Sequence, residues 1–240
     1  MFVVGVSGAG GAACSGTLYK NSFVLTAAHC YAAWADGDNS GVIGDSPQDV
    51  DPRTLLIWGG PDANGNPINL PQLQIRKHPD ATWGQAVGAD VALVMVDAGF
   101  DLNKAPGAAP YYRASRIHGQ RVLRIYESPS DTLTGAIVDN FGFGSLGGTI
   151  LNNHVGQVSE SFPGWFRVVA FDGGGVTEPG DSGGPAFYCN STPLSTVCRI
   201  AGIHSTGGGG SSADVGANEF SMAPAKFGLL TESDVGPMAP

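Results

Sequence analysis

Short apolar runs recur along the chain, separated by stretches rich in glycine, proline, aspartate and asparagine. Such runs predict β-strands, because β-branched and aromatic residues pack well on a pleated surface while glycine and proline favour turns. Their regular spacing is typical of a β-sandwich or a β-barrel. We expect strands at 17–26, 53–58, 72–77, 90–96, 120–126, 134–143, 165–171, 186–189, 199–204 and 219–222.

The polar stretches divide these strands into two groups. Residues 98–116 are rich in alanine, proline and glycine and separate two strand-dense halves. We therefore expect a linker there and two domains, 1–105 and 106–240. Two inserts in the first half, 36–52 and 59–71, have the composition of surface loops.

The composition supports an all-β protein and limits its partners. Of the 240 residues, 37 are glycine and 16 are proline, and only 14% are charged, whereas roughly 25% is usual. Long exposed helices need more charged residues than this. The net charge of −9 comes without a cluster of Lys or Arg, which argues against nucleic acid or a membrane surface as a partner. The tightest apolar run, 91–96, is too short to span a bilayer.

Four cysteines fall into two local pairs, Cys14 with Cys30 near the start and Cys189 with Cys198 near the end. The even number and the local pairing indicate two disulfides and an oxidising compartment. Buried free thiols in a cytosolic protein are the alternative. No metal site is expected, because the chain has no Cys-x-x-Cys and no His pair at ligand spacing. Residues 1–19 lack the basic and apolar regions of a signal peptide.

The strongest chemical signal is the hexapeptide GDSGGP at 180–185. A serine hydroxyl needs a base to take its proton and backbone N–H groups to hold the oxyanion that follows. With no Cβ, Gly180 can turn its N–H toward the same point as the N–H of Ser182, and Gly183 and Gly184 permit close approach of a substrate. The segment therefore indicates a serine nucleophile.

His29 is the predicted base and Asp90 the predicted carboxylate. His29 follows an apolar strand in VLTAAHC, where the adjacent cysteine fixes the chain. Asp90 opens the apolar run DVALVMV. A carboxylate beside a buried strand needs a hydrogen-bonded or cationic partner, and an imidazole is such a partner.

Several short motifs follow one another in a fixed order: CSGTL at 14–18, TAAHC at 26–30, DVALVMV at 90–96, FGFG at 141–144, GDSGGP at 180–185 and AGIHSTGG at 201–208. In sequence and in the order His, Asp, Ser, they resemble the chymotrypsin/trypsin-like serine endopeptidases. The resemblance implies two antiparallel six-stranded barrels with the active site in the cleft between them, and a Cys14–Cys30 disulfide. Cys189 and Cys198 do not match the commonest pairs of that family, so we expect a local staple across the hairpin after the nucleophile.

The resemblance also implies a role for each matched residue. Ser182 is the nucleophile, His29 the general base and acid, and Asp90 the orienting carboxylate. Gly180 and Ser182 supply the oxyanion-hole amides. Ser205 resembles the serine whose hydroxyl supports the aspartate and whose backbone binds the substrate as an added strand.

The residues expected in the specificity pocket are Val176, Thr177, His204 and Gly207. In this family the side chain six positions before the nucleophile, here Val176, lies at the base of the pocket, and valine argues against a preference for Arg or Lys. Thr177 and His204 resemble the residues of glutamyl endopeptidases that face an acidic side chain, because hydroxyl and imidazole groups can solvate a carboxylate. A small or apolar preference, with His204 purely structural, is the alternative.

The activation of the protein raises a separate question. Trypsin-like enzymes are usually switched on when a new N-terminal ammonium pairs with the aspartate before the nucleophile, here Asp181. Only 13 residues precede Cys14, and they contain no Ile-Val-Gly-Gly start. We expect either that a longer precursor has been trimmed or that Asp181 has another donor.

The sequence as a whole predicts a serine endopeptidase, secreted or periplasmic, that acts as a monomer on protein or peptide substrates. It needs no cofactor and can be a target of protein inhibitors. A catalytically silent homologue that binds proteins through the same cleft is the alternative, and the presence of His29, Asp90 and Ser182 argues against it.

Overall fold

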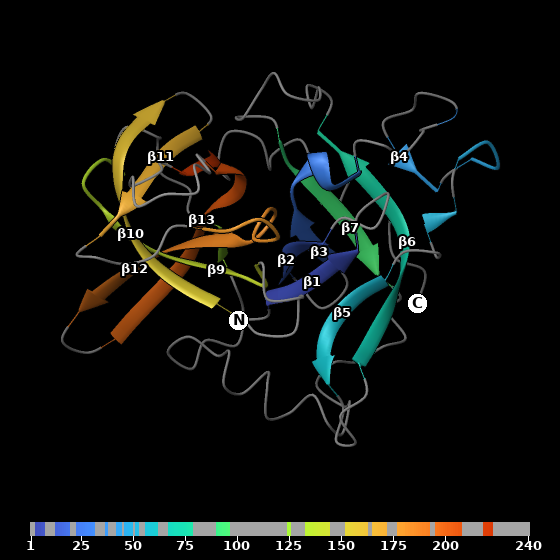
Figure 1. Ribbon diagram of the computed structural model, residues 1–240, viewed down its shortest axis with the longest axis horizontal. Helices are drawn as coiled ribbons and strands as arrows, with labels where there is room; N and C mark the ends of the chain where they lie inside the picture. The colour runs from blue at the N-terminus through green and yellow to red at the C-terminus, as the bar shows by residue number, and fades with distance from the viewer. Residues whose placement is uncertain are drawn as a thin grey trace.

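The strands of the protein form two β-barrels that lie side by side (Figure 1). The computed structural model describes residues 3–7, 13–19, 23–31, 37, 42–44, 46–49, 51–52, 56–61, 67–78, 90–96, 124–125, 133–144, 152–162, 165–171, 177–192, 195–207 and 218–222. Strands β1 to β7 belong to one sheet and β8 to β14 to the other. The boundary expected at residues 105 and 106, and the linker at 98–116, lie outside the described residues.

The first sheet closes on itself, because its order β6-β5-β1-β2-β3-β7 is completed by pairing of β7 with β6. Its strands are β1 (Val3–Ser7), β2 (Ala13–Tyr19), β3 (Phe23–Thr26), β5 (Leu56–Pro61), β6 (Pro67–Lys77) and β7 (Ala92–Val96). The two-residue strand β4 (Val42–Ile43) adds to the edge of β6. A 3-10 helix, Ala28–Tyr31, follows β3 directly.

The second sheet closes in the same way, in the order β12-β9-β10-β11-β14-β13 with β13 paired to β12. Its strands are β9 (Ile137–Gly142), β10 (Asn152–Phe162), β11 (Trp165–Ala170), β12 (Pro185–Thr192), β13 (Ser195–Gly207) and β14 (Asn218–Met222). The short strand β8 (Arg124–Ile125) runs parallel to β13. Among the described strands, six therefore close each barrel, as the resemblance implied.

Alternating side chains fill the interior of each barrel. Along β9, Val138, Asn140 and Gly142 are buried while the residues between them are more exposed, which is the two-residue period of a strand with one face inward. Val138 belongs to an apolar cluster that reaches across the second barrel. The other buried members of that cluster are Leu133, Val158, Phe166, Val168, Ala186 and Ala201.

The strands differ from the sequence prediction in four places, most of them in the first barrel. The single strand expected at 17–26 is two antiparallel strands, β2 and β3, with Thr17 opposite Leu25. The insert 59–71 is not wholly a loop, because it contains the end of β5 and the start of β6, which pair with each other. The insert 36–52 contains β4 beside its turns. Strands β1 and β10 were not predicted.

Both expected disulfides are present, Cys14–Cys30 and Cys189–Cys198. The alternative of buried free thiols is therefore wrong. The second bridge joins residues that lie opposite each other in the β12–β13 hairpin, as expected for a local staple. In the part of the chain that the structure describes, no helix has the length and apolar character needed to cross a membrane.

Candidate active site

Strand pairing in the first barrel brings His29 and Asp90 together. β3 and β7 run antiparallel, with Thr26 opposite Ala92. The chain leaves β3 into the short helix that contains His29, and it enters β7 just after Asp90, so both residues lie at the same end of this strand pair. The His29 Nδ1 lies 2.6 Å from Asp90 Oδ2, and the backbone N–H of His29 donates to Asp90 Oδ1 at 2.8 Å.

Asp90 also receives a hydrogen bond from the second barrel. The hydroxyl of Ser205, in β13, donates to Asp90 Oδ2 at 2.6 Å. Burial, the largest contribution, raises the pKa of Asp90, but the hydrogen bonds from His29 and Ser205 and the charge of His29 together outweigh it and leave the pKa below its usual value. The carboxylate is therefore ionised at neutral pH. It fixes the imidazole with Nδ1 toward Asp90 and Nε2 on the opposite edge of the ring.

Ser182 lies in the turn before β12, and its loop is tied to both barrels. The carbonyl of Ser182 accepts the backbone N–H of Ser15, in β2, at 2.7 Å. On the other side, the N–H of Gly183 donates to the carbonyl of His204, in β13, at 2.8 Å. Because Ser205 follows His204, the Ser182 loop lies against the same strand that reaches the predicted carboxylate.

Gly183 allows this loop to approach the first barrel closely. Its φ is 83°, a conformation that side chains other than glycine rarely adopt. A Cβ there would overlap the hydroxyl of Thr26 and the carbonyl oxygen of Ser15. This glycine of GDSGGP therefore serves the contact between the barrels.

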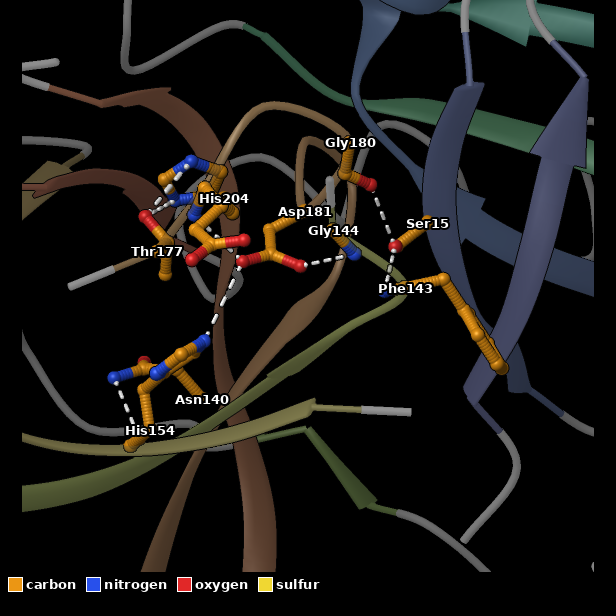
Figure 2. A network of polar contacts seen from close by, with 10 residues as sticks. Ser15, Asn140, Phe143, Gly144, His154, Thr177, Gly180, Asp181 and His204 are labelled. Carbon is orange, nitrogen blue, oxygen red and sulfur yellow. Dashed lines mark hydrogen bonds and ion pairs between the residues drawn. The ribbon is translucent and has the colours of Figure 1, made fainter. Parts of the chain in front are cut away.

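The carboxylate of Asp181 is almost fully buried and is held mainly by backbone amides (Figure 2). Its Oδ1 accepts the N–H of Gly144 and its Oδ2 accepts the N–H of Glu178, each at 2.8 Å. The Nε2 of His154, in β10, lies 3.7 Å from Oδ2, which is within ion-pair range but too long for a hydrogen bond. Of the two expectations for Asp181, these contacts match the one in which donors other than an N-terminal ammonium hold it.

The glycines of FGFG make room for this carboxylate. A Cβ on Gly142 would overlap Asp181 Oδ1, and one on Gly144 would come within 3.1 Å of the same oxygen. The motif at 141–144 thus supplies both the space and one of the amides that Asp181 uses.

The structure brings together two residues of the expected specificity pocket. The hydroxyl of Thr177 lies 3.2 Å from His204 Nε2 (Figure 2). Burial and, to a lesser extent, repulsion by His29 lower the pKa of His204 to about 3, so its imidazole is neutral at neutral pH and carries one N–H donor. Val176 lies outside the described residues, and Gly207 ends β13.

One described cluster has the spacing of a metal site. The sulfurs of Cys14 and Cys30 and a ring nitrogen of His29 lie within 4.8 Å of one another. The two sulfurs are bonded to each other in a disulfide, however, whereas a cysteine binds a metal as a free thiolate. The cluster is therefore a disulfide beside His29.

The sequence prediction assigned no role to two residues beside this site, the buried Ser15 and the partly buried His154. Ser15 lies inside the CSGTL motif, and a small hydroxyl residue directly after the disulfide cysteine was a usable signal. No motif marks His154, because its approach to Asp181 depends on the β9–β10 pairing, which sets it opposite Asn140.

Comparison with known proteins agrees with this geometry. The model of the family described as Trypsin matches residues 1–222. The chain belongs to the trypsin family. Among solved structures, this trypsin-family chain is similar to one described as a Glu endopeptidase in complex with MPD. The TM-score is 0.58 and the sequence identity 16%, and the match covers 93% of this chain and 85% of that chain. That likeness supports the double-barrel fold.

No curated protein sequence matches the chain. Family membership and fold together make the protein a trypsin-like serine protease, with proteins or peptides as the class of substrate.

Proposed function

We propose that this protein hydrolyses peptide bonds through an acyl-enzyme on Ser182, with His29 as general base and acid and Asp90 as the orienting carboxylate. The observation that carries the proposal is the series Ser205 Oγ, Asp90 Oδ2, His29 Nδ1, in which both contacts measure 2.6 Å. An ionised carboxylate at Nδ1 leaves Nε2 to take a proton and stabilises the imidazolium that results.

In the first half of the reaction, the oxygen of Ser182 bonds to the carbonyl carbon of the scissile peptide while its proton passes to His29 Nε2. The C–N bond then breaks, and the leaving amine takes that proton. In the second half, a water molecule attacks the ester and gives one proton to His29. The proton returns to the Ser182 oxygen as the acid product leaves.

The backbone N–H groups of Gly180 and Ser182 would stabilise the negative oxygen of each tetrahedral intermediate. Asp181, which lies between these two residues, supports this role. Its buried carboxylate accepts hydrogen bonds from the amides of Gly144 and Glu178, and these contacts hold the loop in place. Charge develops on the oxygen only during the reaction, so amides fixed beforehand lower the barrier.

Labelling with a fluorophosphonate probe tests the proposal. We expect the wild-type chain to be labelled at Ser182 and the Ser182→Ala variant not to be labelled. Asp90→Asn should lower kcat by about 10⁴-fold, because the imidazole loses its orienting charge. A folded wild-type chain that labels no faster than Ser182→Ala would instead support the catalytically silent homologue.

We also propose a preference for glutamate before the cleaved bond. The support is the contact between Thr177 and His204, in which a hydroxyl and a neutral imidazole lie within 3.2 Å. Two hydrogen-bond donors can replace water around a carboxylate, and the carboxylate itself would favour protonation of His204. An arginine or lysine side chain would find no negatively charged partner in these two groups.

Cleavage of a peptide library measures this preference. We expect peptides with Glu at the cut site to be hydrolysed faster than peptides with Arg, and His204→Ala to lower kcat/KM for Glu by 10-fold or more while leaving the rate for small apolar residues nearly unchanged. Dominance of small or apolar residues in the wild-type profile would favour the alternative pocket, and dominance of Arg or Lys would contradict both.

The two disulfides support a location outside the reducing cytosol. We propose that the protein is secreted or periplasmic, with Cys14–Cys30 and Cys189–Cys198 oxidised where it acts.

A further inference from the structure

Ser15 links the first barrel to the second through several hydrogen bonds. It is fully buried in β2, and its hydroxyl accepts the backbone N–H of Phe143 at 2.8 Å and donates to the carbonyl of Gly180 at 2.8 Å (Figure 2). Its backbone N–H reaches the carbonyl of Ser182 at 2.7 Å. Three hydrogen bonds from one residue therefore cross from the first barrel to the second.

Two of these three partners of Ser15, Gly180 and Ser182, are the residues whose amides are expected to form the oxyanion hole. Gly180 has a φ of 101°, and a glycine in this region has little steric barrier to rotation of the peptide that follows it. The hydroxyl of Ser15 holds the carbonyl of that peptide in one direction. The Ser15 N–H does the same for the carbonyl of Ser182.

Serine is well suited to this position because one hydroxyl can accept from an amide and donate to a carbonyl at the same time. The geometry uses both abilities, with Phe143 as donor and Gly180 as acceptor. The position of Ser15 is itself fixed, since the Thr26 hydroxyl donates to its carbonyl at 2.7 Å and Cys14 beside it is in a disulfide.

We propose that Ser15 is a positioning residue of the oxyanion hole. By holding the Gly180–Asp181 peptide, which lies between the Gly180 and Ser182 amides, and the carbonyl of Ser182, it keeps both amides directed at the substrate carbonyl. This inference rests on the proposed function. Ser15 touches neither the substrate nor the reacting atoms, and it acts through the loop that carries them. Its loss should therefore weaken binding of the transition state and leave binding of the ground state nearly unchanged.

Kinetics of Ser15→Ala and Thr17→Val test this role. Thr17 lies two residues along β2, on the same face of the strand, and its hydroxyl is buried without a hydrogen-bond partner, so Thr17→Val controls for the loss of a buried hydroxyl. For Ser15→Ala we expect kcat to fall by about 10- to 100-fold, KM to change less than twofold, and affinity for a peptide boronate to fall in proportion to kcat/KM. Thr17→Val should match the wild type.

Ser15→Gly is the second variant in case Ser15→Ala does not fold. Removing the side chain opens room for a water molecule to satisfy Phe143 and Gly180, so the fold is kept while the fixed link is lost, and kcat should still fall at least fivefold. A wild-type kcat in either folded variant, or equal losses in Ser15→Ala and Thr17→Val, would overturn the inference. A wild-type chain no more active than Ser182→Ala would defeat the proposed function, and this inference with it.

Discussion

At the scale of single residues, the site depends on two groups in different charge states, the partly buried Asp90, which is ionised, and the buried His204, which is neutral. Hydrogen bonds from His29 and Ser205 keep Asp90 ionised despite its burial, whereas His204 has a neutral hydroxyl beside it and is kept neutral by burial. A charge is retained in a barrel junction only where donors surround it. The same reasoning gives His204 a measurable effect on stability.

The stability of the protein should fall as the pH drops below about 6.5. The pKa of His204 is about 3 in the folded state against 6.5 for an ordinary histidine, so between these values the unfolded chain binds a proton that the folded chain does not. Between pH 7 and pH 5, this difference costs about 2 kcal/mol of unfolding free energy. Urea unfolding at both pH values, on the wild type and His204→Gln, measures the effect.

The glutamine variant is the control, because it keeps a polar side chain that does not titrate. We expect its unfolding free energy to change less between the two pH values than that of the wild type. The remaining histidines and the carboxylates contribute equally to both proteins. An identical pH dependence in the two would contradict a neutral His204 in the folded state.

At the scale of elements, register decides which residues meet. The pairing of Thr26 with Ala92 brings the helix of His29 beside Asp90, and no property of either segment alone specifies it. The motifs around these residues were nevertheless recognisable, since apolar runs with a polar residue at one end remain visible in the sequence. The predicted strands at 90–96, 165–171 and 219–222 correspond closely to β7, β11 and β14.

Strand β10 and the extensions of strands β5 and β6, which the sequence prediction missed, depend on neighbouring strands for their stability. Strand β10 has few apolar residues, with Val155 and Val158 three positions apart, and a register shift follows Val158. Strands β5 and β6 continue into Gly- and Pro-rich sequence because pairing with each other and barrel closure outweigh local preference. The composition of the insert 59–71 favours a loop, and the strand pairing in it is seen only in the closed barrel.

At the scale of the whole molecule, the site exists only where the two barrels meet. His29, Asp90 and Ser15 come from the first barrel, while Ser182 and Ser205 come from the second. Motif resemblance could identify His29 and Asp90 in the first barrel and Ser182 and Ser205 in the second, because each of these residues lies in a local motif. It assigned no role to Ser15, although that residue lies within the CSGTL motif, and it could not identify His154. The contacts of both residues join segments far apart in the sequence.

The two disulfides should therefore affect activity differently although both stabilise the fold. Cys30 follows His29 in the short helix. Cys189 and Cys198 instead lie opposite each other in the β12–β13 hairpin. Cys189 is about four residues, or roughly 13 Å, from the start of β12, which is the end of the strand nearest Ser182. By loop-closure entropy, the bridges spanning 16 and 9 residues contribute about 3 and about 2.5 kcal/mol.

We expect the double variants Cys14→Ser with Cys30→Ser and Cys189→Ser with Cys198→Ser to lower Tm by similar amounts. Only the first pair should also lower kcat at 25 °C, because the chain next to His29 loses its covalent anchor while the hairpin of the second pair keeps its backbone hydrogen bonds. Thermal unfolding combined with active-site titration separates the folded fraction from the rate per folded molecule. An equal loss of kcat in both variants would mean that the second barrel transmits strain from its hairpin to Ser182, and would contradict the local role of the Cys189–Cys198 bridge.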